Sequence, residues 1–437
     1  MVNLKNYITV LERYEDDIRL NKIGACWLFS QSQMKEHGCK RKWSYSQIIG
    51  ISDNETSTAL LYGVGWHVIM EHSLLRIKNN DKCITVDEGI EYCETVARDY
   101  LNSEYDNIPM EEIYKQEWIE STIDRYKRGI VGWVKHWREV HKEYEVIAVE
   151  QTLLAPVLDP YTNDVYKPRN SFLIEKDYMY PCGVNDTGEK VQLEMPYYKI
   201  GRADAIVRKR GTTSLFILDH KTTSQPKSYS RKFLFDMQLA SYCALLNYEI
   251  QEGELQDLKG FEIKGVIWDL CHSKIPDRPS LLKSGKLSTA KNKLVPSWIF
   301  EEAIEYYDLD RSDYDDHIND LKITDHNYFQ LLEVSVSNMD ISRAYLEDYA
   351  TARSMHETRL NLHKCDDIEF NFKAPRYPIC EQYQHCKYSK YCLPNTDLSK
   401  LFHDSIKKDK KIYWKVLTDK SECITIDNEG EQISLPF

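Results

Sequence analysis

The chain has 437 residues, of which 42% are hydrophobic and 12% aromatic, enough to bury a sizeable core. The formal net charge of −12 argues against nucleic-acid binding through overall charge, but phosphate binding depends on local clusters of Lys and Arg. No apolar run is long enough to span a membrane, and the first residues lack the basic segment and apolar core of a secretory signal. We therefore expect a cytoplasmic protein whose twelve cysteines are reduced or bind a metal.

Residues 57–144 show a helical pattern of apolar residues. In the first long helix of this part, Gly63, His67 and Glu71 are spaced by four residues and so share one face. Neutral imidazole binds metals, although a histidine on an apolar helix is more commonly a packed core residue. His67 is therefore a candidate metal ligand.

A strand is predicted at residues 146–150. It ends on Glu150, which is either an accessory acidic residue near a metal site or a solvated glutamate at a strand end. Residues 158–197 are rich in turn-forming pairs such as Asp159-Pro160 and are interpreted as an insertion. The insertion carries no catalytic motif, but it is well placed in the sequence to cover a site formed by the segment that follows.

That following segment is the most informative part of the chain. Two apolar stretches are joined by the turn-like run Arg208-Lys209-Arg210-Gly211, which predicts a β-hairpin. Such a hairpin can place Asp204 and Asp219 side by side at its open end, with Lys221 two residues further on the same face. Two carboxylates and an ammonium at one point are typical of a divalent-cation site that hydrolyses a phosphodiester. The alternative is a surface hairpin with a solvated Asp–Lys pair.

Helical and strand segments follow the hairpin. Residues 235–242 predict a helix on which Gln238 and Tyr242 share one face, a pair that in isolation also fits an ordinary amphipathic helix. A further strand is predicted at 265–270, and residues 297–360 are predicted to be helical and polar.

The order of these motifs resembles the PD-(D/E)XK nuclease superfamily. Its signature is an acidic residue followed, on the next strand, by Asp or Glu, any residue, and Lys, which here are Asp204 and Asp219-His220-Lys221. The histidine motif from Gly63 to Glu71, and Gln238 with Tyr242, resemble the RecB-type branch of this superfamily.

The resemblance implies an α/β fold with a restriction-endonuclease-like core, in which a central mixed sheet is flanked by helices. Helical additions and an insertion extend that core. It further implies a single nuclease domain over residues 1–396, with a C-terminal tail over 397–437.

In this superfamily the acidic residues bind Mg²⁺ or Mn²⁺. By this resemblance Asp204, Asp219 and His67 would hold one or two such ions, and the backbone carbonyl of His220 would add a ligand. Lys221 would orient the attacking water or stabilise developing negative charge.

Gln238 and Tyr242 would face the active site and fix the DNA strand by hydrogen bonding or stacking. Two basic runs, Lys40-Arg41-Lys42 and Arg208-Lys209-Arg210, are candidate contacts for phosphates.

Cysteines form a second motif. Cys380, Cys386 and Cys392 follow the predicted core, and Cys39 precedes it within a basic and aromatic run. This order is similar to an iron–sulfur subgroup of RecB-type nucleases related to CRISPR-associated exonucleases, and implies a 4Fe–4S cluster on these four thiolates. The five residues between Cys380 and Cys386 depart from the C-x-x-C spacing common in that subgroup. Zinc and free reduced cysteines are the alternatives. Residues that could replace one ligand are His385, Cys26 and His37.

Together these features predict a Mg²⁺- or Mn²⁺-dependent deoxyribonuclease, an exonuclease on single-stranded DNA or DNA ends, for phage or bacterial recombination, repair or degradation. Its expected location is the cytoplasm of a bacterial or phage-infected cell. The sequence has no phosphate-binding P-loop, so either a partner helicase unwinds the DNA or the substrate is already single-stranded. A helicase or a recombination protein is the expected partner. The alternatives are an inactive DNA-binding recombination scaffold and an exonuclease of CRISPR spacer acquisition. The motifs define no oligomeric state.

Overall fold

The computed structural model describes residues 26–44, 46, 57–168, 182–184, 190–192, 196–226, 238–290, 295–364 and 386. The chain divides into two compact units. The first unit contains residues 1–53, 154–201 and 342–437, and the second unit contains residues 54–153 and 202–341. The predicted tail over 397–437, together with Cys380 and Cys392, lies outside the described residues.

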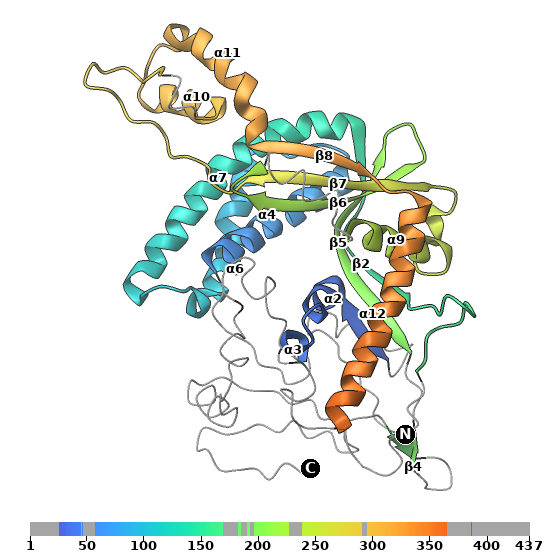
Figure 1. Ribbon diagram of the computed structural model, residues 1–437. Coiled ribbons are helices and arrows are strands. Elements are labelled where there is room, and N and C mark those ends of the chain that lie inside the picture. The colour runs from blue at the N-terminus through green and yellow to red at the C-terminus, as the bar shows by residue number, and fades with distance from the viewer. Residues whose placement is uncertain are drawn as a thin grey trace. The chain divides into compact units, whose positions relative to one another are not determined.

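The framework is a mixed six-stranded sheet in the order β1-β5-β6-β7-β8, with β2 also paired to β5 (Figure 1). The β5–β6 and β7–β8 pairs are antiparallel, whereas β6 and β7 are parallel. A mixed sheet flanked by helices was predicted, and it is confirmed. The strands of the sheet are β1 (Trp27–Ser30), β2 (Tyr144–Pro156), β5 (Tyr197–Lys209), β6 (Ser214–Thr223), β7 (Glu262–His272) and β8 (Phe329–Ser335).

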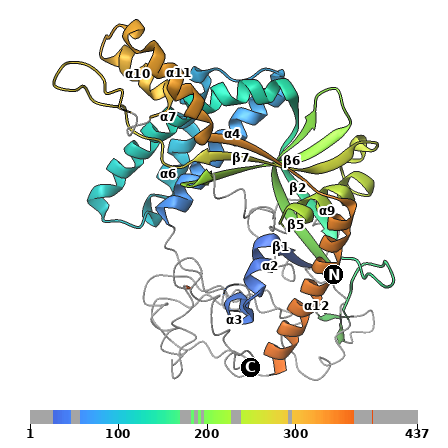
Figure 2. The same cartoon turned by 45° about the horizontal axis from the view of Figure 1, so that its top comes forward.

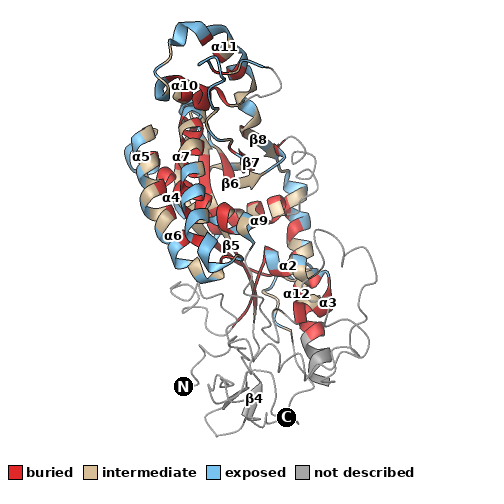
Figure 3. Ribbon diagram, turned by 90° about the vertical axis from the view of Figure 1, so that its left-hand side faces the viewer, coloured by how far each residue is buried: buried red, intermediate tan, exposed pale blue. Residues whose placement is uncertain are grey.

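In the second unit, helices pack on the sheet and enclose the main hydrophobic core. α4 (Thr58–Asn80) and α7 (Glu112–Glu143) lie together on one face, and their buried sides are turned toward the strands (Figures 1 and 3). Alternate residues of the strands, including Leu218 and Ile267, point into that core. α9 (Gln238–Gln251) packs along β7. Besides short 3-10 turns, the described part of this unit also contains α5 (Val86–Tyr92), a π-helical turn (Cys93–Ala97), α6 (Arg98–Ser103), α10 (Ser297–Tyr306) and α11 (Asp315–Thr324).

The helix that carries His67 has clear start and stop signals. Ser57 caps α4, because its side chain accepts a hydrogen bond from the backbone N–H of Leu60 at 3.2 Å. The helix ends at Asp81, which has the left-handed conformation with φ 48°. Between these ends, apolar residues spaced by three or four positions are buried, so α4 is anchored along its length.

The first unit is built around β1, the first residues of β5, and three helices: α2 (Gln31–His37), α3 (Lys40–Trp43) and α12 (Asn338–Lys364) (Figure 2). Lys199 of β5 and Asp348 of α12 form a buried ion pair. His37 and Thr358 lie in hydrogen-bond contact at 3.1 Å. This unit also contains the two-stranded sheet of β3 (Cys182–Val184) and β4 (Lys190–Gln192).

One predicted element differs from the structure. Residues 297–360 were expected to be helical, but β8 lies within them and pairs with β7 from Phe329 to Ser335. β8 is the last strand in the sheet order and is only half-buried, so its apolar signal is weak between two polar helices.

Candidate active site

The β5–β6 hairpin brings the two predicted aspartates together. Its antiparallel ladder runs from the Arg208–Leu215 pair to the Ala205–Leu218 pair, so Asp204 and Asp219 follow directly at its end. The carboxylate of Asp204 accepts the backbone N–H of His220 at 2.7 Å. This bond joins the two strands at the point where the ladder stops.

His67 faces Asp204 from α4. Its Nδ1 lies 3.3 Å from the Asp204 carboxylate. Burial lowers the pKa of His67, but the neighbouring Asp204 outweighs burial and raises it above its usual value. Burial likewise raises the pKa of Asp204, and the basic groups around it, His67 first, reverse the effect and hold it well below its usual range. The pair therefore favours an ionised Asp204.

Asp219 and Lys221 form an ion pair on the adjoining strand. Asp219 is only 5% exposed, which excludes the solvated surface pair considered above. Burial raises the pKa of Asp219, Lys221 opposes this and Asp204 adds to it, so the net shift is upward. Burial lowers the pKa of Lys221, but Asp219 and Asp204 together raise it. The ammonium also lies 5.2 Å from the centre of the Trp268 ring, a cation–π contact from β7.

The predicted pair on α9 reaches the same centre. Gln238 hydrogen-bonds to the Tyr242 side chain, and burial and Asp219 raise the pKa of Tyr242 to about 12. The phenol therefore stays protonated and can donate a hydrogen bond. The Tyr242 side chain interacts electrostatically with both Lys221 and Asp219, so it lies near their ion pair.

Glu150, whose role the sequence left open, is a third acidic group near this centre. It forms an ion pair with Arg202 and has φ 51°, a left-handed conformation within β2. Burial, followed by repulsion from Asp204, raises the pKa of Glu150 to about 7 despite the opposing Arg202. A strained backbone at a charged, half-buried position is typical of functional sites.

A buried network behind the hairpin was missed by sequence reasoning. The side chain of His220 turns away from Asp219 and Lys221, and its Nδ1 lies 2.9 Å from Asp269 of β7. The indole N–H groups of Trp133 and Trp137 donate to the same carboxylate oxygen at 3.0 and 2.9 Å. The available signals were a lone aspartate in an apolar strand and two tryptophans spaced by four on a helix.

The donor set fits a hard divalent cation. Mg²⁺ keeps several waters and needs only one or two protein carboxylates besides the phosphate of its substrate, which Asp204 and Asp219 can supply. Repulsion from the Asp204 carboxylate contributes to the raised pKa values of both Glu150 and Asp219. A cation would relieve that repulsion. Among the described residues, no three His, Cys, Asp or Glu side chains are grouped to hold a metal, which a water-rich magnesium site does not require.

The predicted cysteine cluster is only partly within the described chain. Cys39 is buried and Cys386 is half-buried, and neither forms a disulfide. With Cys380 and Cys392 outside the described residues, the part of the chain that the structure describes shows no thiolate metal site.

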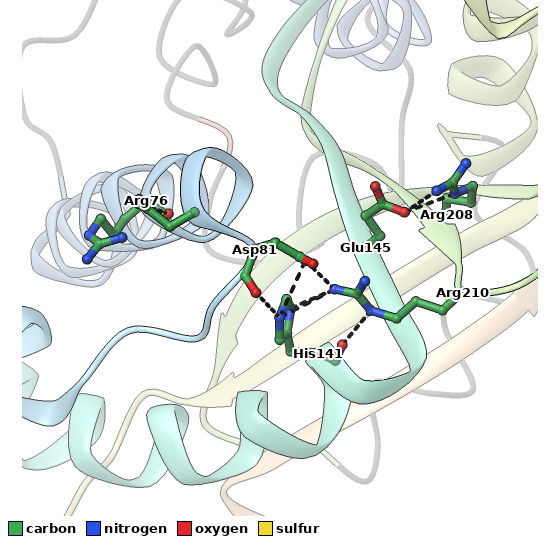
Figure 4. Close-up of polar contacts among 7 residues, drawn as sticks. Arg76, Asp81, His141, Glu145, Arg208 and Arg210 are labelled. Carbon is green, nitrogen blue, oxygen red and sulfur yellow. Dashed lines mark hydrogen bonds and ion pairs between the residues drawn. The ribbon is translucent and has the colours of Figure 1, made fainter.

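Two of the three predicted phosphate contacts at the turn of the hairpin, Arg208 and Arg210, are paired with acidic side chains. Arg208 donates to Glu145 at 3.0 Å, and Arg210 contacts Asp81 and the carbonyl of His141, the latter at 2.9 Å (Figure 4). These ion pairs reduce the positive charge that this turn offers to DNA.

A family model described as the PD-(D/E)XK nuclease superfamily matches residues 29–393, most of the chain. The chain belongs to this superfamily. Membership implies a metal-dependent nuclease that hydrolyses phosphodiester bonds, with DNA as its substrate, and it agrees with the mixed sheet described above. No curated protein sequence matches the chain. Of the described helices of this PD-(D/E)XK protein, none is both long and apolar enough to cross a membrane.

Proposed function

We propose that the chain is a Mg²⁺- or Mn²⁺-dependent deoxyribonuclease whose reaction centre contains Asp204, Asp219 and Lys221. The observation that supports this is their convergence at the open end of the β5–β6 hairpin, with Asp219 buried and paired to Lys221. Asp219 is buried, and Asp204 and Lys221 are half-buried beside it. Charged groups gathered in this way, with shifted pKa values, are typical of functional sites.

Asp204 and Asp219, with the backbone carbonyl of His220, would hold the ion, and His67 would add its imidazole in the neutral form. A bound Mg²⁺ or Mn²⁺ would supply an acidified water and neutralise charge on the phosphate. The bond from the His220 N–H to Asp204 at 2.7 Å orients one of these ligands before any ion arrives.

Lys221 and Tyr242 would act on the substrate. Lys221 remains an ammonium, because its pKa is raised by Asp219 and Asp204 against the effect of burial, so it can stabilise negative charge that develops on the phosphate. Tyr242, oriented by Gln238, can donate to a phosphate oxygen or stack on a base.

The finer assignment is an exonuclease of the RecB-type branch that acts on single-stranded DNA or DNA ends in recombination, repair or degradation. It is supported by the order of the His67, Asp204, Asp219–Lys221 and Gln238–Tyr242 motifs along the chain. We include in this proposal a 4Fe–4S cluster, with zinc as the alternative metal, on Cys39, Cys380, Cys386 and Cys392.

The test is degradation of end-labelled single- and double-stranded DNA with Mg²⁺ or Mn²⁺, and with EDTA as the metal-free reference. Asp219→Asn removes the charge but keeps the shape of the buried side chain. We expect its cleavage rate to fall by at least about 10²-fold, because a carboxylate that would hold the metal ion is lost. DNA affinity, measured by fluorescence anisotropy in Ca²⁺, should change little.

Asp316→Asn is the matched control, because Asp316 is an exposed carboxylate on α11. It should cleave like the wild type. Equal cleavage by Asp219→Asn and Asp316→Asn would refute the proposed reaction centre. Binding of DNA without any cleavage by the wild type would favour a binding scaffold, and the position of the lost label gives the polarity.

A further inference from the structure

The middle residue of the Asp219-His220-Lys221 triplet is held from behind by the neighbouring strand. β6 and β7 are parallel, with His220 opposite Asp269 in the register. Side chains alternate along a strand, so His220 and Asp269 share the face opposite to Asp219 and Lys221. Their side chains meet there, with the His220 Nδ1 atom 2.9 Å from the Asp269 carboxylate.

The buried carboxylate of Asp269 takes part in three hydrogen bonds. The carboxylate is 2% exposed, and one of its oxygens accepts from His220, Trp133 and Trp137 at 2.9, 3.0 and 2.9 Å. The two indole N–H groups can only donate, so this carboxylate oxygen is an acceptor. We therefore assign the proton of the His220–Asp269 hydrogen bond to the Nδ1 of His220.

A buried charge of this kind is not needed to hold a helix on a sheet. Apolar residues of similar volume commonly serve that purpose equally well, whereas a satisfied polar network fixes one arrangement. What this network fixes is the orientation of His220. Trp133 and Trp137 lie one turn apart on α7, with their ring centres 5.1 Å apart. The two packed rings hold the Asp269 carboxylate in one position.

The backbone of His220 links the position of its side chain to the reaction centre. Its backbone N–H is the donor to the Asp204 carboxylate, and its chain neighbours are Asp219 and Lys221. A rotation of the imidazole would tilt the peptide that holds Asp204. On the other face of β7, Trp268, the residue before Asp269, supports the Lys221 ammonium.

We infer that Asp269 is a positioning residue for the nuclease reaction: through His220 it sets the geometry of the Asp204 and Asp219 carboxylates, the proposed metal ligands. The inference rests on the proposed function, because it assigns Asp269 a role in that same site. Asp269 does not touch the substrate or the ion itself.

The test compares Asp269→Asn with the wild type by two readouts: Mn²⁺ affinity by EPR titration without DNA, and kcat and KM for DNA cleavage. Loss of an outer-shell partner typically costs about 10–100-fold, so we expect weaker Mn²⁺ binding and lower kcat on that scale, with KM nearly unchanged. If Asp269 served only in packing, the substitution would lower the melting temperature but leave the Mn²⁺ affinity and kcat of the folded protein unchanged.

Val134→Ala is the packing control, because Val134 is buried in the same core and makes no side-chain hydrogen bond. It should lower stability and leave Mn²⁺ affinity and kcat unchanged. If Asp269→Asn does not fold, Trp137→Phe removes a single donor to the carboxylate and keeps an aromatic ring in place. An intermediate loss of Mn²⁺ affinity is expected for this variant.

Two variants at His220 distinguish the effect of its hydrogen bond to Asp269 from the effect of its side-chain volume. His220→Asn keeps an N–H that can reach Asp269, whereas His220→Leu does not. We expect the Asn variant to keep at least about tenfold higher Mn²⁺ affinity and kcat than the Leu variant. Equal values for these two, or Asp269→Asn behaving like Val134→Ala, would overturn the positioning role while cleavage by the wild type stands. A wild type that neither binds Mn²⁺ nor cleaves would instead refute the proposed function and with it this inference.

Discussion

At the scale of single residues, Glu150 is where charge, burial and backbone strain meet. Its φ of 51° lies in the left-handed region, which a side chain other than glycine adopts at a cost. Its carboxyl is half-buried beside Asp204, and Arg202 is its ion-pair partner. The pKa of about 7 makes it the acidic group of the site that titrates near neutral pH.

This shift predicts how stability depends on pH. The native carboxyl of Glu150, with a pKa of about 7, binds a proton more tightly than the unfolded chain does, so the native state loses stability as pH rises toward 7. Glu150→Gln removes this loss. We expect the variant to gain roughly 3 kcal/mol relative to the wild type between pH 4 and pH 8.

The measurement is urea unfolding at several pH values with EDTA present. Glu117→Gln, at an exposed position of α7, serves as the control and should show no such trend. A stability difference between Glu150→Gln and the wild type that is the same at every pH would contradict the assignment.

The residues that sequence reasoning found share a local signal. Asp219 and Lys221 are two apart in a strand, and Asp204 lies across a short turn, so their proximity follows from one hairpin. Asp269 was missed because its partners come from α7 and β6, more than forty positions away in the chain. No local pattern encodes which helix covers which strand.

At the scale of elements, the sheet of the second unit depends on one close backbone approach. Gly265 of β7 has φ 155°, and a Cβ at this position would lie 2.0 Å from the carbonyl oxygen of Val334 in β8. At the same level the β6–β7 register shifts, because Leu215 and Phe216 pair with Ile263 and Gly265 and leave Lys264 of β7 as an extra residue. Only a residue without a side chain lets the three strands pair here.

We therefore expect Gly265→Ala to cost about 2–4 kcal/mol of stability, because a backbone carbonyl cannot move aside as a flexible side chain can. Gly260→Ala is the matched control: Gly260 also has a positive φ, of 94°, but a Cβ there would meet nothing within 4 Å. It should cost only about 1 kcal/mol. Chemical denaturation of both variants measures these costs. Equal losses of stability in the two variants would show that the positive φ alone, and not the contact with Val334, is responsible.

Elements with a strong local pattern were predictable, whereas those defined by pairing were not. α4 and α7 have apolar residues at helical spacing, and the hairpin has a turn between two apolar strands. β8 was mistaken for part of a helical segment, because its pairing with β7 across the whole of α10 and α11 gives no local signal.

At the scale of the whole molecule, the centre that contains Asp204, Asp219 and Lys221 is built entirely from the second unit, whereas Cys39 and Cys386 belong to the first. This division separates the expected effects of the two groups of residues. Changes at the carboxylates act on the chemistry. Changes at the cysteines should act on folding, because the proposed metal cluster would close most of the chain and would mainly restrict the unfolded state.

We accordingly expect Cys386→Ala, purified without oxygen, to lose visible absorption and several degrees of melting temperature. Its cleavage rate per folded molecule should fall far less than that of Asp219→Asn. Cys243→Ala is the control, because Cys243 is buried in α9 of the second unit, outside the proposed cluster. A colourless wild type with no bound iron or zinc by elemental analysis would contradict the cluster.

The contact between His220 and Asp269 has a consequence for anyone who transplants this site. The Asp219-His220-Lys221 triplet is written with an arbitrary middle residue, yet here that residue is buried and bonded to the next parallel strand. A hairpin grafted onto another scaffold with only its aspartates and lysine would leave a buried imidazole without its acceptor. A graft that keeps the acceptor of this imidazole must therefore include β5, β6, β7 and the turn of α7 that carries Trp133 and Trp137.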